Sequence, residues 1–102
     1  MDDPYAFQLD PALARDTVPI ADWHLCQVRL MNDSRYPWVI LIPKVLDTAE
    51  IHELTEEQQH LLMGESVRLS KALDQLFAPH KLNVAALGNA VRQLHIHHIV
   101  RL

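Results

Sequence analysis

Two histidines near the end of the chain, His95 and His97, are separated by one aliphatic residue. Polar and aliphatic side chains alternate along residues 93–102 as they do along a β-strand, which predicts that Gln93, His95 and His97 share one face. Side chains two positions apart on a strand lie about 6.6 Å from each other, so both imidazoles could bracket one phosphate-sized group. The alternative is a sheet face on which histidine fills half-buried positions. Clustered histidines favour a functional site.

Imidazole serves proteins as a nucleophile, as a general acid or base, and as a metal ligand. Two histidines without paired cysteines make an incomplete metal site, which would have to recruit His24, His52 or an acidic residue. Nucleophilic or acid–base work needs only one oriented imidazole with a second nearby. A phosphate ester is the natural target, because imidazole attack on phosphorus splits one difficult displacement into two. A histidine-based metal site remains the alternative.

The turn before the histidines contains Gly88 and Asn89. Glycine permits unusual backbone angles, so the N–H groups of this turn and the Asn89 amide could face a phosphate oxygen. An ordinary hairpin turn explains the same two residues. The position of the turn beside the histidines favours a role in substrate binding.

The chain has 102 residues, of which 49% are hydrophobic, and a formal net charge of -4 at pH 7. This size and composition predict one globular domain over residues 1–102. An acidic chain lacks the positive field that drives binding to a nucleic-acid backbone, so we expect no nucleic-acid polymer as a partner. A small anionic ligand is still compatible, because it needs only a local positive or N–H-rich surface.

The first four residues are acidic and have neither the basic start nor the apolar run of a signal peptide. No stretch approaches the ~20 apolar residues of a membrane span, so we expect a cytoplasmic protein without a membrane partner. The single cysteine, Cys26, cannot form an internal disulfide. It lies in residues 25–31, which resemble a buried strand, and is predicted to be buried in the core rather than to act as a nucleophile.

Two apolar segments joined by turn residues predict an antiparallel hairpin. The strands are expected at residues 24–31 and 38–42, with the turn at residues 32–37. Pro43 cannot donate to a ladder and ends the second strand, and residues 44–54 form a connector. Residues 10–22, which contain Pro11 and Pro19, are predicted to form a short helical turn and an irregular edge segment.

One long helix is predicted over residues 56–77. Thr55 and Gln58 form a capping box at its start, and Pro79 follows its end. Gly64 inside the helix suggests a close approach to the sheet. The expected apolar stripe consists of Leu62, Leu69, Leu73 and Leu76, with Val67 beside them.

Strands at residues 81–87 and 91–102, joined by the Gly88-Asn89 turn, complete the chain. Strands outnumber helices and short loops join neighbours. The expected class is therefore α+β, with a largely antiparallel sheet and one long helix.

The last part of the chain resembles the histidine triad family, whose motif is His-φ-His-φ-His-φ-φ, with φ apolar, after a Gly-Gln-x-Val stretch. Residues 88–92 (Gly-Asn-Ala-Val-Arg) match the lead-in, and residues 93–99 (Gln-Leu-His-Ile-His-His-Ile) match the motif. Residues 40–44 resemble the family's strand ending in Ile-Pro-Lys, and residues 50–58 resemble the segment before its long helix. The likeness covers most of the chain, residues 25–102, and implies the family's fold and a homodimer.

The resemblance also implies roles for the two histidines. His95 stands where the family's middle motif histidine attacks the α-phosphorus of a nucleotide and forms a nucleotidyl-histidine. His97 stands where the third motif histidine contacts the phosphate and the leaving-group oxygen, which suits a general acid. The implied activity is that of a nucleotide hydrolase or nucleotidyl transferase, acting on a conjugate such as a phosphoramidate or a dinucleotide, with no cofactor.

Three asparagines are implied as substrate-binding residues. Asn89, beside Gly88, stands where the family usually has a phosphate-contacting glutamine. Asn83 matches an asparagine near the phosphate end of the site, and Asn32 resembles a partner of the ribose hydroxyls. Each asparagine also has an explanation as a turn or strand-end residue.

Two positions depart from the motif. Gln93 replaces its first histidine; it can donate and accept hydrogen bonds and is expected to orient His95, but it cannot carry a charge. His98 stands at an apolar position and is expected to be a hydrogen-bonded packing residue. Family members usually continue beyond the motif strand, so we expect a C-terminal segment of the pocket to be missing here. The alternative to an enzyme is a nucleotide-binding or interaction module with little catalysis.

Overall fold

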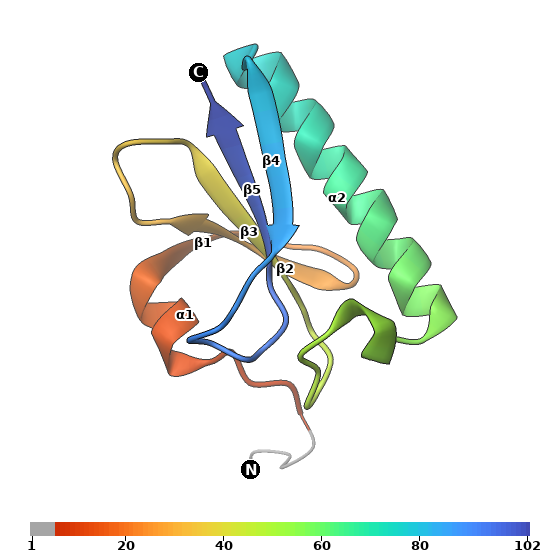
Figure 1. Cartoon of the computed structure of the whole chain (residues 1–102). Coiled ribbons are helices and arrows are strands. Elements are labelled where there is room, and N and C mark those ends of the chain that lie inside the picture. Colours follow the sequence, from red (N-terminus) through yellow and green to blue (C-terminus); the bar gives the residue numbers. More distant parts are fainter. Residues whose placement is uncertain (1–5) are drawn as a thin grey trace.

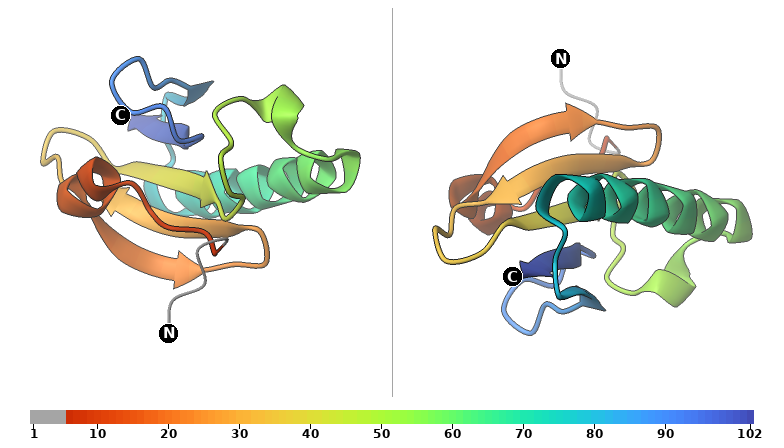
Figure 2. Two further views of the ribbon diagram at one scale, coloured as in Figure 1. Left: turned by 90° about the horizontal axis from the view of Figure 1, so that it is seen from below. Right: turned by 90° about the horizontal axis from the view of Figure 1, so that it is seen from above.

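One antiparallel sheet of five strands, in the order β1-β2-β3-β5-β4, organises the chain. The computed structural model describes residues 6–102, so the acidic start over residues 1–4, on which the signal-peptide prediction rests, lies outside the described part. The strands are β1 (Thr17–Asp22), β2 (Cys26–Met31), β3 (Trp38–Pro43), β4 (Lys81–Ala86) and β5 (Ile96–Arg101). The helices are α1 (Pro11–Asp16), a 3₁₀ turn over Ile51–Glu53 and α2 (Glu56–Phe77). The long helix α2 and the short helix α1 are seen against the sheet in Figure 1 and, turned by 90°, in Figure 2. The predicted α+β class is confirmed.

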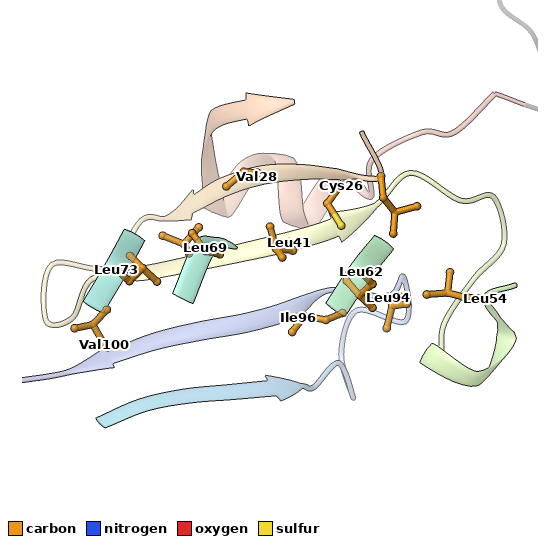
Figure 3. Close-up of a cluster of buried hydrophobic side chains, with 12 residues drawn as sticks. Cys26, Val28, Leu41, Leu54, Leu62, Leu69, Leu73, Leu94, Ile96 and Val100 are labelled. Atoms are coloured by element: carbon orange, nitrogen blue, oxygen red, sulfur yellow. The ribbon is translucent and has the colours of Figure 1, made fainter. Parts of the chain in front are cut away.

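Alternation along β3 divides the apolar side chains between two clusters. Val39 and Leu41 belong to the larger cluster, to which α2 contributes Leu62, Leu69 and Leu73 (Figure 3). Their neighbours in the chain, Ile40 and Ile42, instead pack with Leu13 of α1, together with Phe7 and Leu9. Successive strand residues point to opposite faces, so one strand supplies both layers. The sheet is therefore covered by α2 on one face and by α1 and the N-terminal segment on the other.

The predicted hairpin and the predicted long helix are both confirmed. Strands β2 and β3 pair antiparallel, and Pro43 is the last residue of β3. Helix α2 begins after Thr55, whose hydroxyl accepts from Gln58 N–H at 3.1 Å while the Gln58 side chain accepts from Thr55 N–H at 2.9 Å. Over residues 6–102, no helix combines the length and apolarity that a membrane crossing requires.

The segment that the sequence suggested would be irregular forms a regular edge strand, β1, which pairs antiparallel with β2. The short helix before it was predicted correctly. Pro19 is tolerated because β1 lies at the sheet edge, and the register shifts between Pro19 and Ala21. One proline therefore bends this strand without ending it.

The buried face of α2 differs from the predicted stripe. Leu76 and Val67 are exposed, whereas the carboxylate of Glu65 is buried and accepts from the N–H groups of Leu25 and Cys26 at 2.8 and 2.9 Å. Gly64 makes no close approach to the sheet, since nothing lies within 4 Å of a Cβ placed there. Cys26 is buried as predicted, and burial raises the pKa of its thiol, which keeps it protonated.

The last strand begins later than predicted, at Ile96 rather than at residue 91. Gly88 adopts a φ of 141°, and Leu94 N–H donates to the Thr48 carbonyl at 2.9 Å instead of to a strand. Residues 87–95 therefore form a loop that packs against the connector before α2. This loop delivers His95 to the start of β5.

Candidate active site

His95 is the last residue of the loop and lies immediately before β5. Its Nδ1 lies 2.6 Å from the carbonyl oxygen of Gln93. A carbonyl oxygen can only accept, so Nδ1 carries the proton, and Nε2 of the neutral ring keeps its lone pair. The side chain is buried apart from 4% of its surface. The fold thus fixes Nδ1 of His95 as a donor, and Nε2 has no hydrogen-bond partner within residues 6–102.

His97 lies on β5 beside His95. The ring centroids are 4.9 Å apart, with the planes inclined by 63°. Nδ1 of His97 accepts from the indole Nε1–H of Trp38 at 2.9 Å. Burial, and then the neighbouring His95 and His98, lowers the pKa of His97 to about 4. The ring is therefore neutral at pH 7, with its proton on Nε2.

Gly88 lies close to the ring of His95. A Cβ at this position would lie 3.1 Å from His95 Cε1 and 2.4 Å from the Val91 carbonyl oxygen. Together with the positive φ, this proximity excludes any side chain. Gly88 and Asn89 line a cavity of about 380 Å³ that also includes Arg92 and Glu50. The loop therefore lines a polar cavity, and Gly88 connects this cavity to the surroundings of His95.

Gln93 contacts His95 through its backbone, not through its side chain. The side-chain Oε1 accepts from Asp10 N–H at 2.8 Å, and Nε2 donates to the Gln8 carbonyl at 2.9 Å. The expectation that the amide itself orients His95 is therefore wrong. The carbonyl of the same residue does so instead, while the side chain fastens the N-terminal segment.

The structure brings neither Asn83 nor Asn32 into contact with the histidines. The Asn83 side chain accepts from Arg101 Nε–H at 2.6 Å, and Asn83 pairs with Ile99, beyond His97 along the sheet. Asn32 follows β2, is exposed, and donates its N–H to the Asp16 carbonyl. Both asparagines lie toward the other end of the sheet from Gly88.

His98 points to the opposite face, as predicted. It is fully buried, its Nε2 lies 2.7 Å from Ser66 Oγ on α2, and its Nδ1 lies 3.2 Å from the Ile96 carbonyl. Burial lowers its pKa, so it is a neutral hydrogen-bonded packing residue.

The contact between Trp38 and His97 is not predictable from the sequence alone. An aromatic residue at the start of a β-branched run signals a strand, and nothing in its spacing from residue 97 marks a contact. The contact follows from the register of β3 and β5, in which Trp38 pairs with Ile99 and Ile40 pairs with His97. Trp38 and His97 are therefore diagonal neighbours on adjacent strands. Only the register places the indole within reach of the imidazole.

The metal alternative finds no support in the geometry. Within residues 6–102, no three His, Cys, Asp or Glu side chains gather closely enough to hold a metal ion. His24 and His52 do not join the pair.

The sheet order, the long helix and the paired histidines at the start of the last strand are those of a histidine triad fold. The family model of the HIT domain matches residues 12–102, and the chain belongs to this family. Proteins of the family are generally nucleotide-binding hydrolases and transferases, and some members are not catalytic. No curated protein matches the chain significantly.

Solved structures of three histidine triad proteins are similar to this chain. The protein of Bradyrhizobium japonicum is 46% identical with a TM-score of 0.93, over 94% of this chain and 72% of that one. The protein of Marinobacter aquaeolei is 54% identical with a TM-score of 0.92, over 94% and 70%. The protein of Sinorhizobium meliloti is 47% identical with a TM-score of 0.91, over 93% and 70%.

Proposed function

We propose that this protein cleaves nucleotide conjugates at the α-phosphate through a covalent nucleotidyl-His95 intermediate. The observation that carries the proposal is the tautomer of His95, whose Nδ1–H donates to the Gln93 carbonyl. The free Nε2 is the nucleophile, and the backbone contact fixes its direction. Such an imidazole needs no separate base to activate it.

In the first step, the lone pair of His95 Nε2 attacks the α-phosphorus, and the bond from phosphorus to the leaving group breaks. In the second step, water attacks the phosphorus, the P–N bond returns its electron pair to Nε2, and a proton passes to the solvent. Transfer to another acceptor replaces water in the second step. Both displacements are favoured mainly by positioning and charge stabilisation.

The groups around His95 suit the phosphoryl oxygens. Nε2–H of His97 is a donor directed away from Trp38, and we assign it to the phosphate and the leaving group. The N–H groups near Gly88 and the amide of Asn89 are further proposed donors, because they line the adjoining cavity. Asn32 and Asn83 are proposed as contacts to a more distant part of the substrate.

The test is intact-mass spectrometry after rapid quenching of the protein with adenosine 5′-phosphoramidate. We expect an adenylyl adduct that maps to His95 by peptide analysis, together with release of AMP. The variant His95→Ala should form no adduct and lose turnover by at least about 10³-fold, while its circular dichroism spectrum stays unchanged. Full activity of this variant would contradict the mechanism.

The same experiment decides the alternative function. The Gln93 amide cannot act as a general acid or base, and its side chain is hydrogen-bonded to the N-terminal segment. Both features favour a binding module as the second candidate. Binding of AMP in calorimetry without adduct or turnover, for all conjugates tried, would establish that module.

We also propose that the protein acts as a homodimer. The support is an apolar groove of about 450 Å³ between α2 and β4, to which Met63, Val84 and Ile51 contribute exposed side chains. Sedimentation equilibrium should give twice the chain mass at micromolar concentration. A single-chain mass throughout would exclude the dimer.

A further inference from the structure

Trp38 forms the only side-chain hydrogen bond to His97 within residues 6–102. The indole Nε1–H donates to His97 Nδ1 at 2.9 Å, and the two ring centroids are 5.5 Å apart. Trp38 is itself anchored at the first position of β3 and packs against the cluster of Leu13, Ile40 and Ile42. The donor is therefore held on a rigid element rather than on a mobile loop.

The chemistry of an indole makes this contact directional. Its N–H can donate and cannot accept, so His97 Nδ1 must offer a lone pair and the ring proton must sit on Nε2. A proton added to Nδ1 would place two N–H groups against each other and break the bond.

The other neighbours of His97 also favour its neutral form. Its sheet partners are apolar, Ile40 on β3 and Ala85 on β4. The titratable groups that influence it, His95 and His98, disfavour a second positive charge and lower its pKa. Within residues 6–102, no carboxylate hydrogen-bonds to His97, so nothing stabilises an imidazolium there.

We propose that Trp38 is a positioning residue that fixes His97 as a neutral Nε2–H donor. In this role His97 stabilises charge on the phosphoryl and leaving-group atoms by hydrogen bonding and keeps its proton. The inference rests on the proposed function and corrects its expected detail, since the resemblance assigned His97 the role of a general acid. A leaving group that is stable as an anion, such as a phosphate or an aryl oxide, then departs with its electron pair and is solvated by His97, whereas the nitrogen of a phosphoramidate takes its proton from the solvent and departs as ammonia.

The first test measures the tautomer and needs no turnover. Two-bond ¹H–¹⁵N spectra of histidine-labelled protein report which ring nitrogen carries the proton, with and without AMP. We expect His97 to be neutral with Nε2 protonated from pH 5.5 to pH 8. In Trp38→Phe, which keeps an aromatic ring but lacks the N–H, both tautomers should appear. The matched control is Trp23→Phe, because Trp23 stacks on Arg68 away from the site.

An Nδ1-protonated or positively charged His97 in the wild-type protein at pH 7 would overturn the inference. So would a Trp38→Phe protein that folds and shows the unchanged single tautomer. If Trp38→Phe does not fold, the wild-type spectrum decides alone.

The second test is a leaving-group series of adenosine 5′-phosphate aryl esters, from p-nitrophenyl to phenyl. We expect Trp38→Phe to lower kcat by about 10-fold for p-nitrophenol and about 100-fold for phenol, with KM changed less than 3-fold. Poorer leaving groups carry more charge in the transition state, so they depend more on the donor. If Trp38→Phe only disturbed the structure of the site in general, kcat would fall equally for all leaving groups, and this result would argue against a positioning role. Absence of any nucleotidyl-His95 in the wild-type protein defeats the proposed function, whereas the spectra still decide the Trp38 contact.

Discussion

His97 and His98 are adjacent, and the fold gives them opposite surroundings. His97 faces the candidate site, contacts the His95 ring and accepts from Trp38. His98 faces α2, is fully buried and hydrogen-bonds with Ser66. Burial lowers the pKa of both, so the ionisation state does not separate them. The two residues differ in the partner of Nε2. In His98 this nitrogen hydrogen-bonds with the Ser66 hydroxyl, whereas in His97 it has no such partner among the described residues and faces the candidate site.

This pair shows that neighbouring histidines in a sequence cluster can have different roles, one at a functional site and the other in packing. A perturbed pKa marks both residues, and only the strand alternation and the partner of Nε2 distinguish them. A histidine whose two nitrogens are both occupied within the fold contributes to packing. One that keeps a nitrogen directed toward an open space is available to a substrate.

Among changes to this pair of histidines, the largest expected effect is the loss of catalysis in a His97 variant. His97→Ala should lower kcat about 10²–10³-fold, which corresponds to about 3–4 kcal/mol of transition-state stabilisation. Stopped-flow assays of adduct formation measure it. The comparison fails if His98→Ala reduces kcat as strongly while it stays folded.

The next effect is on stability at the α2 face. His98→Ala leaves a cavity and removes the partner of Ser66, so the free energy of unfolding should fall by about 2–3 kcal/mol. Urea denaturation followed by circular dichroism measures it, and kcat at a temperature where the variant is folded should change less than 3-fold. A smaller stability loss than in His97→Ala would reverse our assignment.

Lowering the pH should reduce the free energy of unfolding, because both His97 and His98 are held neutral in the folded protein. An unfolded histidine titrates near pH 6.5, whereas the pKa of folded His97 is about 4 and that of His98 is also lowered. Between those values the unfolded chain binds more protons. Stability contributed by neutral burial is therefore complete above about pH 6.5. The contribution of His97 declines as the pH falls toward 4, by at most about 1.4 kcal/mol per pH unit, and that of His98 declines in the same direction.

Urea midpoints at pH 7, 5.5 and 4.5 measure this slope. His98→Ala should reduce it, because one of the two contributions is lost. An identical slope in that variant would show that His98 is not held neutral by the fold.

The smallest expected effect concerns the serine alone. Ser66→Ala removes the hydroxyl and leaves His98 Nε2 without its partner, which should cost about 1 kcal/mol. Catalysis should be unchanged, and thermal unfolding detects the difference. A loss of activity in Ser66→Ala would connect the two faces and blur the distinction between them.

Local patterns predicted much of the fold. The capping box at Thr55 gave the start of α2, and Pro43 gave the end of β3. The face of His98 followed from alternation with Leu94 and Ile96. These features depend on neighbours within a few residues, where periodicity and capping chemistry operate.

The wrong or missing predictions concern features that depend on contacts between segments far apart in the sequence. The buried Glu65 satisfies two N–H groups near β2, so a charged residue replaces an apolar one on the inner side of α2. The late start of β5 results from a bond between Leu94 and Thr48. The Trp38 contact depends on sheet register. None of these has a signature in the local sequence.

The side chain of Gln93 ties down Gln8 and Asp10, while its carbonyl orients His95. Gln93 therefore holds both the beginning of the described chain and the ring of His95. An alteration ahead of α1, such as a fused purification tag or a trimmed terminus, is separated from the His95 imidazole only by Gln93 and the two hydrogen bonds that it makes to either side. The N-terminus should therefore be identical in all variants that are compared.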